Sequence, residues 1–480
     1  MHRFLFQQNQ YKMKTNIKRI MLILLSVMIL AGCKKEDPTA QAPESTQNIN
    51  QFIKDVMSDI YLWYKQLPKI DIRYEFDSKA YFKKLLYKED KWSFITDDVQ
   101  SLENSFQGKE KSFGWSLAFG QFKGSENVFA LVEFVYPNTP AENAGFKRGD
   151  MIYKINNAAI TVDNYTDLLY SDNINCTSGN YINQDSIINT KTTQMTSEEL
   201  QLDPVLFPKI IEESGHKIGY FLYAQFIGEY DSSLDTVIQH FKDAGVQDVV
   251  VDLRYNPGGT TVAAQYLCSS LGPASAVDND NVLVSFQWND KYQQHWQQNG
   301  VMNQLELRFL NTVPTKMGLQ KIYFLTGHGT ASASELTITG LEPYMDVTTV
   351  GDTTFGKYTA SITLKPEDYY DDENYYKDFA NWGIQPIILR YKNSLGVTDF
   401  VNGFAPDIPV DDDLIAGIPL GDKREPLLKA AIEDITGNVI AAKKRATIKP
   451  YRIFDRGFSR FDDNKREVLV NQVDAKSLFR

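Results

Sequence analysis

The chain has 480 residues, a length that favours two to four compact units. It is 42% hydrophobic and 23% charged, an ordinary globular mixture that excludes collagen, coiled-coil and wholly disordered chains. The net charge of −11 becomes −16 when residues 1–32, which hold five basic and no acidic residues, are set aside. We expect no nucleic-acid partner, because phosphates require a surplus of Lys and Arg.

The N-terminus has the pattern of a secretory signal. A basic stretch, 12–19, precedes an apolar run, 20–31, that is short for a membrane-spanning helix. The run ends in Leu-Ala-Gly-Cys, which resembles the bacterial lipobox, where the cysteine is lipidated and begins the mature chain. Residues 1–32 are therefore predicted to be a lipoprotein signal peptide and Cys33 the lipidation site. The alternative is a signal that merely ends near a cysteine.

The residues after Cys33 indicate a tether in the cell envelope. Lys-Lys-Glu-Asp at 34–37 is similar to the surface-export signal of some Bacteroidetes lipoproteins. This resemblance implies an outer-membrane lipoprotein, on the periplasmic face or the cell surface, that reaches the membrane through a lipid on Cys33. Residues 33–48 are polar, contain two prolines and are predicted to be a flexible tether. The other cysteines, Cys176 and Cys268, fall in different predicted domains, so we expect neither a disulfide framework nor a metal site.

Residues 49–110 are predicted to form a small helical domain. A second helix is expected over 78–87, and the unit ends near Gln107. The first helix shows apolar residues on one face at a period of 3.6, namely Ile49, Phe52, Ile53, Val56, Met57, Ile60 and Trp63.

Residues 111–198 change in character. A strand over 128–135 and a short helix over 141–144 precede the string Gly-Phe-Lys-Arg-Gly-Asp-Met-Ile at 145–152, a turn that leads into a strand. This string resembles a PDZ domain. The segment 171–194 is longer and more polar than is usual for that domain.

The PDZ resemblance assigns a ligand loop. It implies that Gly114, Trp115, Ser116 and Leu117 hold a peptide carboxylate, while the peptide adds as a strand to a sheet edge. The alternative is that Gly114 and Trp115 merely occupy a turn and a core.

Residues 199–440 alternate between apolar strands and helices, which predicts a buried, mainly parallel sheet. The expected strands are 217–224, 248–253, 321–326 and 346–350, and the expected helices are 234–244, 260–271 and 332–341. The tail, 441–480, holds eleven basic and five acidic residues with apolar residues between them. It is predicted to be a solvated or core-clasping tail; a membrane or nucleic-acid patch is the alternative.

Two loops between strand and helix carry the candidate chemistry. The first, 252–259, reads Asp-Leu-Arg-Tyr-Asn-Pro-Gly-Gly. The amides of Gly258 and Gly259 could stabilise an oxyanion, an effect worth about 3–4 kcal/mol for each donor. A plain turn is the alternative reading.

The second loop, 329–336, reads Gly-Thr-Ala-Ser-Ala-Ser-Glu-Leu. Ser332 and Glu335 have the spacing of a helix capping box, a common structural motif. The small neighbours of Ser332 would also leave its hydroxyl accessible, with the N–H of Ala333 pointing toward an oxyanion.

A catalytic serine needs a base. His328 lies in a Gly-flanked turn without an evident Asp partner, and His216, His240 and His295 have no better context. Lys357, in Thr-Phe-Gly-Lys, is the remaining candidate; an exposed lysine on a turn is the alternative.

Together, the motifs Asp-Leu-Arg-x-Asn-x-Gly-Gly, Thr-Ala-Ser-Ala-Ser-Glu and Phe-Gly-Lys resemble the tail-specific (C-terminal processing) serine peptidase family. The lysine follows the middle serine by 25 residues, and the resemblance covers roughly 49–440. It implies an α/β core similar to the ClpP/crotonase fold, with an inserted PDZ domain and a small helical N-terminal unit. It also implies that Ser332 is the nucleophile, Lys357 the general base, and the amides of Ala333 and of Gly258 or Gly259 the oxyanion hole. Ser361 stands where the family often has a glutamine that orients the lysine, and is the candidate third member.

The implied function is a serine endopeptidase that recognises exposed C-terminal tails of protein or peptide substrates and needs no cofactor. The alternatives are a catalytically silent peptide- or ligand-binding envelope lipoprotein on the same fold, a PDZ scaffold, and esterase chemistry. A general-base lysine must be neutral, and an exposed lysine titrates near 10.4. Lowering that value to about 7–8 costs roughly 4 kcal/mol of solvation, so we predict an apolar pocket for Lys357 beside Ser332. The inserts 277–312 and 368–382 either shape a substrate cleft or decorate the surface.

Overall fold

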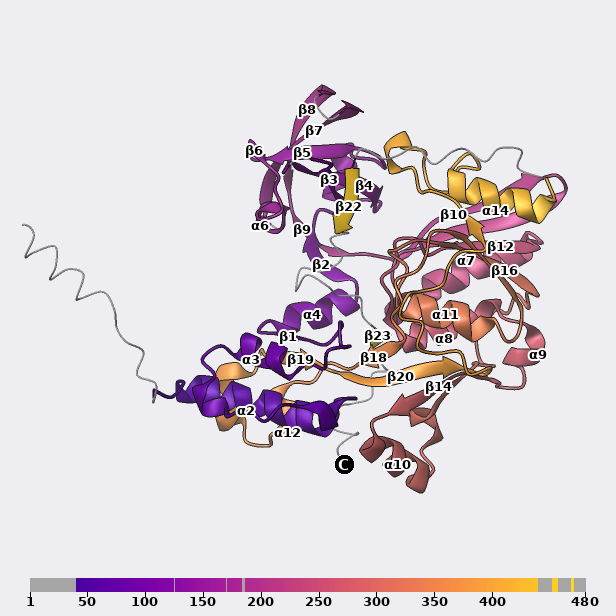
Figure 1. The fold of residues 1–480 in the computed structure, drawn as a ribbon. Coiled ribbons are helices and arrows are strands. Elements are labelled where there is room, and N and C mark those ends of the chain that lie inside the picture. Colours follow the sequence, from indigo (N-terminus) through magenta and orange to yellow (C-terminus); the bar gives the residue numbers. More distant parts are fainter. Residues whose placement is uncertain are drawn as a thin grey trace, which may run out of the picture.

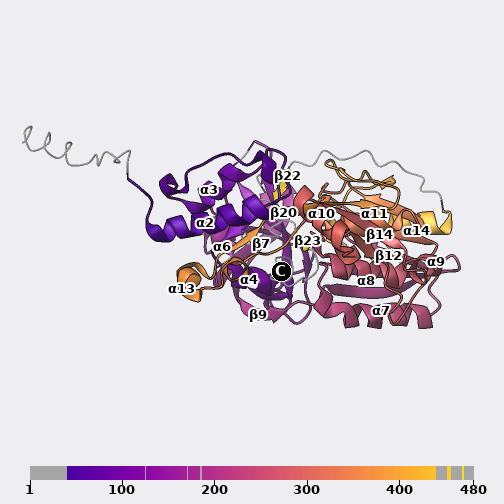
Figure 2. The same ribbon diagram turned by 90° about the horizontal axis from the view of Figure 1, so that it is seen from below.

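The computed structural model describes residues 40–124, 126–169, 171–183, 186–438, 451–455 and 468–469 (Figure 1). The predicted signal peptide and Cys33 lie outside these residues. Within the described ranges, no helix is both long and apolar enough to cross a membrane. Two views show the helical unit and the PDZ region on one side and the layered α/β core on the other (Figures 1 and 2).

The N-terminal unit is helical because each helix has one apolar face to bury. Phe52, Ile53, Val56 and Met57 of its first helix are fully buried. That helix begins at Glu44, so the prediction of a tether was wrong for 44–48. The apolar period starts only after the polar first turn, where an acidic residue suits the helix N-terminus. The elements are α2 (Glu44–Asp59), η1 (Tyr64–Gln66), η2 (Ile72–Tyr74), α3 (Ser78–Leu85), β1 (Phe94–Thr96) and α4 (Val99–Phe106).

The PDZ region is an antiparallel sheet in the order β22-β3-β4-β5-β7-β8. The polar segment that departs from the usual PDZ pattern forms the long hairpin β7–β8. An antiparallel pair, β2 (Lys109–Ser112) and β9 (Glu198–Gln201), joins this sheet to the rest of the chain. The other elements are β3 (Trp115–Phe122), β4 (Val128–Val135), α5 (Pro140–Asn143), β5 (Met151–Ile155), β6 (Ala158–Ala159), α6 (Tyr165–Leu169), β7 (Asn173–Asn183), β8 (Ser186–Thr196) and β22 (Tyr451–Asp455).

The core is a six-stranded sheet in the order β10-β11-β12-β16-β17-β21, parallel except for β10. Alternate residues of its strands pack on α7, α8 and α11 on one face and on α14 on the other. The prediction of a buried, mainly parallel sheet is confirmed. The elements are β10 (Val205–Glu213), β11 (His216–Tyr223), η3 (Gly228–Tyr230), α7 (Asp231–Asp243), β12 (Asp248–Asp252), α8 (Thr261–Leu271), α9 (Ala274–Val277), β16 (Lys321–Thr326), α11 (Ala333–Leu341), β17 (Asp346–Gly351), β21 (Ile408–Pro409), η6 (Leu414–Ala416) and α14 (Pro426–Thr436).

A second sheet, β13-β23-β18-β20-β14-β15, was not foreseen from the sequence. The insert 277–312 belongs to it, because β14 pairs with β20. The insert 368–382 packs on the helical unit, where the Tyr370 ring lies 6.3 Å from that of Phe52. The elements are β13 (Gly259–Thr260), β14 (Val282–Trp288), α10 (Asp290–Asn299), η4 (Met302–Gln304), β15 (Glu306–Arg308), β18 (Thr359–Ser361), α12 (Pro366–Tyr369), α13 (Glu373–Tyr376), η5 (Lys377–Phe379), β19 (Gly383–Gln385), β20 (Ile387–Asn393) and β23 (Val468–Leu469).

Candidate active site

Ser332 stands in the turn between β16 and α11, immediately before the first helical residue. Its backbone has φ 64° and ψ −112°, whereas a capping serine normally has an extended backbone. A non-glycine residue in such a conformation costs about 1–3 kcal/mol and persists only where its surroundings enforce it. The side chain is buried, and its hydroxyl has no hydrogen-bond partner among the described residues. Ser332 and Glu335 have the arrangement of a capping box, but the strained backbone and the unbonded hydroxyl distinguish this serine from an ordinary cap.

The carboxylate of Glu335, also fully buried, connects the serine turn to the lysine turn. One oxygen accepts from the N–H groups of Ser332 at 2.9 Å and Lys357 at 2.8 Å. The other accepts from the N–H of Gly356 and the hydroxyl of Thr354, both at 2.6 Å. Burial raises the pKa of Glu335 to about 7, although the four hydrogen bonds act to lower it. The predicted capping motif is thus part of a larger brace.

A tyrosine holds the same two residues from a second side. The hydroxyl of Tyr391, on β20, lies 3.1 Å from the carbonyl oxygen of Ser332 and 2.9 Å from that of Lys357. Lys357 itself is 1% exposed, which meets the expectation of a buried lysine. Nothing in the sequence pointed to Tyr391, because β20 joins the site through long-range pairing.

The loop at 252–259, called the glycine loop below, lies beside the turn that holds Ser332. The main chain of Asn256 accepts from the N–H of Ala331 at 3.1 Å, and its side chain accepts from the N–H of Gly258 at 2.9 Å. The amide of Gly258 is therefore already engaged. Gly259 has φ 143°, and a Cβ there would stand 2.1 Å from the carbonyl oxygen of Phe226, so only glycine fits. Of the two glycines, Gly259 is therefore the candidate oxyanion donor, and in this structure it is paired with Val468 of β23.

The second expected donor is the amide of Ala333. Ala333 is the first residue of α11, so its N–H has no acceptor within the helix. It directly follows Ser332, which puts this donor next to the candidate nucleophile.

Buried ion pairs of Arg254 and Arg148 surround the start of the glycine loop. Arg254 contacts Asp252 at 2.9 Å and both carboxylate oxygens of Glu425, at 2.6 and 2.8 Å. Arg148, from the turn before β5, donates to the hydroxyl of Tyr255 and to Asp412. The PDZ region is thereby joined to the residue that follows Arg254. Arg254 and Tyr255 belong to the motif at 252–259, but nothing in the sequence indicated these roles.

Comparison with known proteins places this arrangement in a family. The sequence pattern of peptidase family S41 matches residues 217–410, and that of the peptidase S41 N-terminal domain matches 48–94. The pattern of a PDZ domain matches 131–173. Residues 217–410 of the chain are a peptidase family S41 domain. The recognised resemblance is therefore confirmed.

Relatives of this S41 chain include the "Carboxy-terminal processing protease CtpB" of Bacillus subtilis (strain 168), 24% identical over 63% of this chain and 62% of the relative. Another is the "Carboxyl-terminal-processing protease" of Synechocystis sp. (strain ATCC 27184 / PCC 6803 / Kazusa), 22% identical over 53% of this chain and 52% of the relative. The chain thus spans between half and two thirds of their lengths.

A solved structure shares the fold. The "Putative S41 protease from Bacteroides fragilis NCTC 9343" is 26% identical and superposes with a TM-score of 0.65. The match covers 81% of this chain and 97% of that one. The predicted fold, an α/β peptidase core with a PDZ domain and a helical N-terminal region, is confirmed.

Ser361 lies on β18 and is 1% exposed. Its hydroxyl is 3.4 Å from the side-chain oxygen of Gln385, whose amide donates to Thr363 at 2.8 Å. A glutamine is therefore present near Ser361, but it comes from β19 and not from the position four residues after Lys357. No spacing in the S41 chain's sequence indicated this.

Two of the histidines considered as alternative bases have other contacts. His328 is exposed, and its ring lies 5.5 Å from that of Phe355. His216 contacts Asp248 at 3.0 Å, at the amino end of β12, whereas the glycine loop follows the carboxyl end. Among the described residues, no group of three or more His, Cys, Asp or Glu could hold a metal ion.

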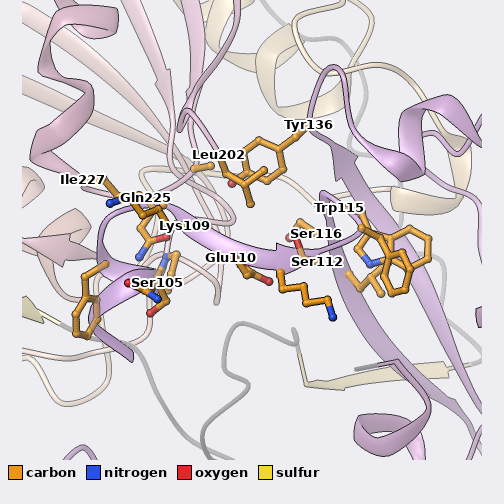
Figure 3. Close-up of a pocket in the computed structure, with 18 of the residues that line it drawn as sticks. Ser105, Lys109, Glu110, Ser112, Trp115, Ser116, Tyr136, Leu202, Gln225 and Ile227 are labelled. Atoms are coloured by element: carbon orange, nitrogen blue, oxygen red, sulfur yellow. The ribbon is translucent and has the colours of Figure 1, made fainter. Parts of the chain in front are cut away.

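A cavity of about 380 Å³ extends from the PDZ region to the glycine loop (Figure 3). Its lining includes Trp115, Ser116 and Leu117 as well as Gly258 and Gly259. Strand β2 runs along it, with Ser112 toward Trp115 and Lys109 toward Gln225 (Figure 3). Gly114, the remaining residue of the predicted carboxylate loop, is not among the lining residues. The cavity thus connects the predicted carboxylate loop with the two candidate oxyanion glycines, while Ser332 and Lys357 are buried and are not among its lining residues.

Proposed function

We propose that this S41 chain is a serine endopeptidase in which Ser332 is the nucleophile and Lys357 the general base. The observation that carries this proposal is the joint placement of two buried residues, a strained serine with an unbonded hydroxyl and a lysine, by one carboxylate and one phenol. A lysine buried merely for structure would not need to share the anchors of a strained serine.

The reaction follows from the chemistry of these groups. The Ser332 oxygen attacks the scissile carbonyl carbon while its proton moves to the neutral amine of Lys357. The N–H groups of Ala333 and Gly259 stabilise the oxyanion. The protonated Lys357 then gives its proton to the leaving amine, and an acyl-enzyme remains. Water releases the acyl group, with Lys357 taking and returning the proton again. Burial favours this mechanism because it disfavours the charged ammonium form.

We propose that the substrates are proteins or peptides with exposed C-terminal tails, held by the PDZ region. The cavity that joins Trp115–Leu117 to the glycine pair supports this assignment. The accompanying division of the chain is a helical domain at 49–110, a PDZ domain at 111–198, a catalytic domain at 199–440 and a tail at 441–480. Ser361 is proposed as a residue that helps to orient Lys357.

The test is proteolysis of an unstructured protein by the chain from Lys34 onward, measured from pH 6 to 10. Ser332→Ala and Lys357→Ala should each reduce turnover at least about 1,000-fold. The exposed neighbours Ser394→Ala and Lys392→Ala serve as matched controls and should stay within twofold of wild type. A serine-reactive covalent probe should label wild type but not Ser332→Ala. Turnover that survives in Ser332→Ala would refute the assignment, and an unlabelled, inactive wild type would favour a silent binding protein.

We also propose that the protein is an envelope lipoprotein anchored through Cys33. The lipobox-like sequence and its basic, apolar leader support this. Metabolic labelling with a fatty acid should mark the wild-type chain and leave Cys33→Ser unlabelled. Equal labelling of both chains would contradict the anchor.

A further inference from the structure

The C-terminal segment supplies strands at two separate places. The first, β22, pairs with the edge of β3 that β4 does not occupy (Figure 1). The pairing is antiparallel, with Tyr451 opposite Phe122 and Asp455 opposite Phe119. As the tail advances, it therefore moves along β3 toward the predicted carboxylate loop at Trp115.

This is the position and direction in which a PDZ domain takes a ligand. Such a ligand adds as an extra strand and places alternate side chains in pockets. Phe454 does so here, since its ring lies 5.7 Å from that of Tyr165, the first residue of α6. The Tyr165 ring is in turn 4.7 Å from that of Phe119 on β3. Phe454 thus occupies the space between β3 and α6.

The second strand, β23, lies at the catalytic loops. It runs parallel to β13, with Val468 opposite Gly259, and parallel to β18, with Leu469 opposite Ser361. In the strand order β23 stands between β13 and β18. The tail therefore puts a peptide backbone beside the candidate oxyanion glycine, where an extended substrate would have to lie.

Charge favours the same association. The tail, 441–480, carries eleven basic and five acidic residues, a net charge of +6. Residues 33–440 carry 34 basic and 56 acidic residues, a net charge of −22. A basic segment tethered to an acidic body has a high effective local concentration, so weak contacts at two points hold it in place.

We propose that the C-terminal segment is an intramolecular competitor of the substrate, with β22 in the PDZ ligand position and β23 beside the catalytic glycine. This proposal rests on the proposed peptidase function. A protein substrate must displace the tail, so the free enzyme works below its full capacity. The partner that displaces it is an extended polypeptide with a bulky apolar residue at the position of Phe454.

The first test measures binding and needs no catalysis. A fluorescent peptide of residues 449–458 is titrated into the inactive chain from Lys34 onward carrying Ser332→Ala, with and without Phe454→Ala. The peptide should bind at least fivefold more tightly when Phe454→Ala weakens the internal tail. Lys392→Ala changes an exposed residue on β20, outside the tail and the PDZ region, and is the control, with affinity expected within twofold of the parent. Equal affinity in all three proteins would overturn the proposal.

The second test measures cleavage of an unstructured protein by the active chains. Phe454→Ala should raise kcat/KM about 3- to 10-fold, mainly by lowering KM, and added 449–458 peptide should inhibit it. A fall in kcat/KM with normal folding would overturn the proposal. Tighter peptide binding in a chain that shows no proteolysis would uphold the occupied PDZ groove and refute the peptidase function, so the two failures are distinguishable.

Discussion

Replacing Glu335 with glutamine tests whether one carboxylate sets the geometry of the candidate dyad. The substitution keeps the shape and turns one acceptor oxygen into an N–H₂ donor. Because each oxygen accepts two hydrogen bonds, the new donor must face either the pair Ser332 and Lys357 or the pair Gly356 and Thr354. The second orientation is less costly, since the Thr354 hydroxyl can rotate, but the Gly356 N–H cannot.

The magnitude follows from this count. One buried N–H left without an acceptor costs about 1–3 kcal/mol, and the remaining bonds lose the strength that a charged acceptor gives them. If about 2–3 kcal/mol of this loss falls on the alignment of Ser332 with Lys357, kcat decreases about 30- to 150-fold. We expect little change in KM, because Glu335 is buried and does not reach a substrate.

The assay is kcat and KM at pH 8 together with unfolding measured from pH 4 to 9. Glu126→Gln, at an exposed position in the turn between β3 and β4, is the control and should behave as wild type. Burial raises the pKa of Glu335 from 4.5 to about 7, so the folded chain keeps this proton longer than the unfolded chain does. Its contribution to stability is full below pH 4.5 and is lost as the pH rises through about 7. The Gln variant should lack this component. A kcat within twofold of wild type would refute the brace.

Three further predictions concern the surroundings of the site. Gly259→Ala should reduce kcat at least 100-fold, because the new Cβ would stand 2.1 Å from the carbonyl oxygen of Phe226. Gly228→Ala is the control and should keep its activity, because a Cβ there meets nothing within 4 Å. Equal activity of the two variants would contradict the tight fit at Gly259. Arg148→Ala should lower kcat/KM for long substrates about tenfold, because it uncouples the PDZ region from the glycine loop. Lys147→Ala, at the exposed neighbouring position, should leave kcat/KM unchanged. Equal kcat/KM values for the two variants would exclude that coupling. Asp231→Asn should stabilise the chain at pH 8 by about 1 kcal/mol in urea unfolding, after allowance for partial exposure, because burial raises the pKa of Asp231 to about 7. The neutral form of Asp231 contributes stability that is full below pH 3.8 and is lost as the pH rises through about 7. The stability difference between Asp231→Asn and wild type should therefore shrink toward pH 5. A difference that stayed constant would argue against this cause.

The sequence predicted those elements whose signal is local. The strands at 128–135 and 321–326 have the predicted bounds, because each is a continuous apolar run between polar turns. The helix after Ser332 begins where the small residues and Glu335 indicated. The burial of Lys357 was deduced from what a basic amine needs at neutral pH rather than from any pattern around it.

What the sequence did not predict depends on distant parts of the chain. The hairpin β7–β8 is polar and so lacks the apolar alternation that marks a strand. The second sheet exists because β20 pairs with both β14 and β18, which no local period reveals. The preference for Gly259 over Gly258 is decided by a side chain, that of Asn256, which takes up one of the two amides. Tyr391 belongs to the site only because β20 passes beside the serine turn.

The separation of 25 residues between Ser332 and Lys357 holds one helix, α11, and one strand, β17. Strands β16 and β17 are parallel neighbours, with Thr326 opposite Gly351, so the loops that follow them leave the same edge of the sheet. One loop holds Ser332 and the other Lys357, while α11 between them puts Glu335 within reach of both. An extra residue between Ser332 and Glu335 would turn the carboxylate by about 100° around the helix and away from both amides. The spacing of three residues between Ser332 and Glu335 is therefore fixed by geometry. The Glu335 carboxylate that holds the candidate nucleophile also holds the candidate base, Lys357.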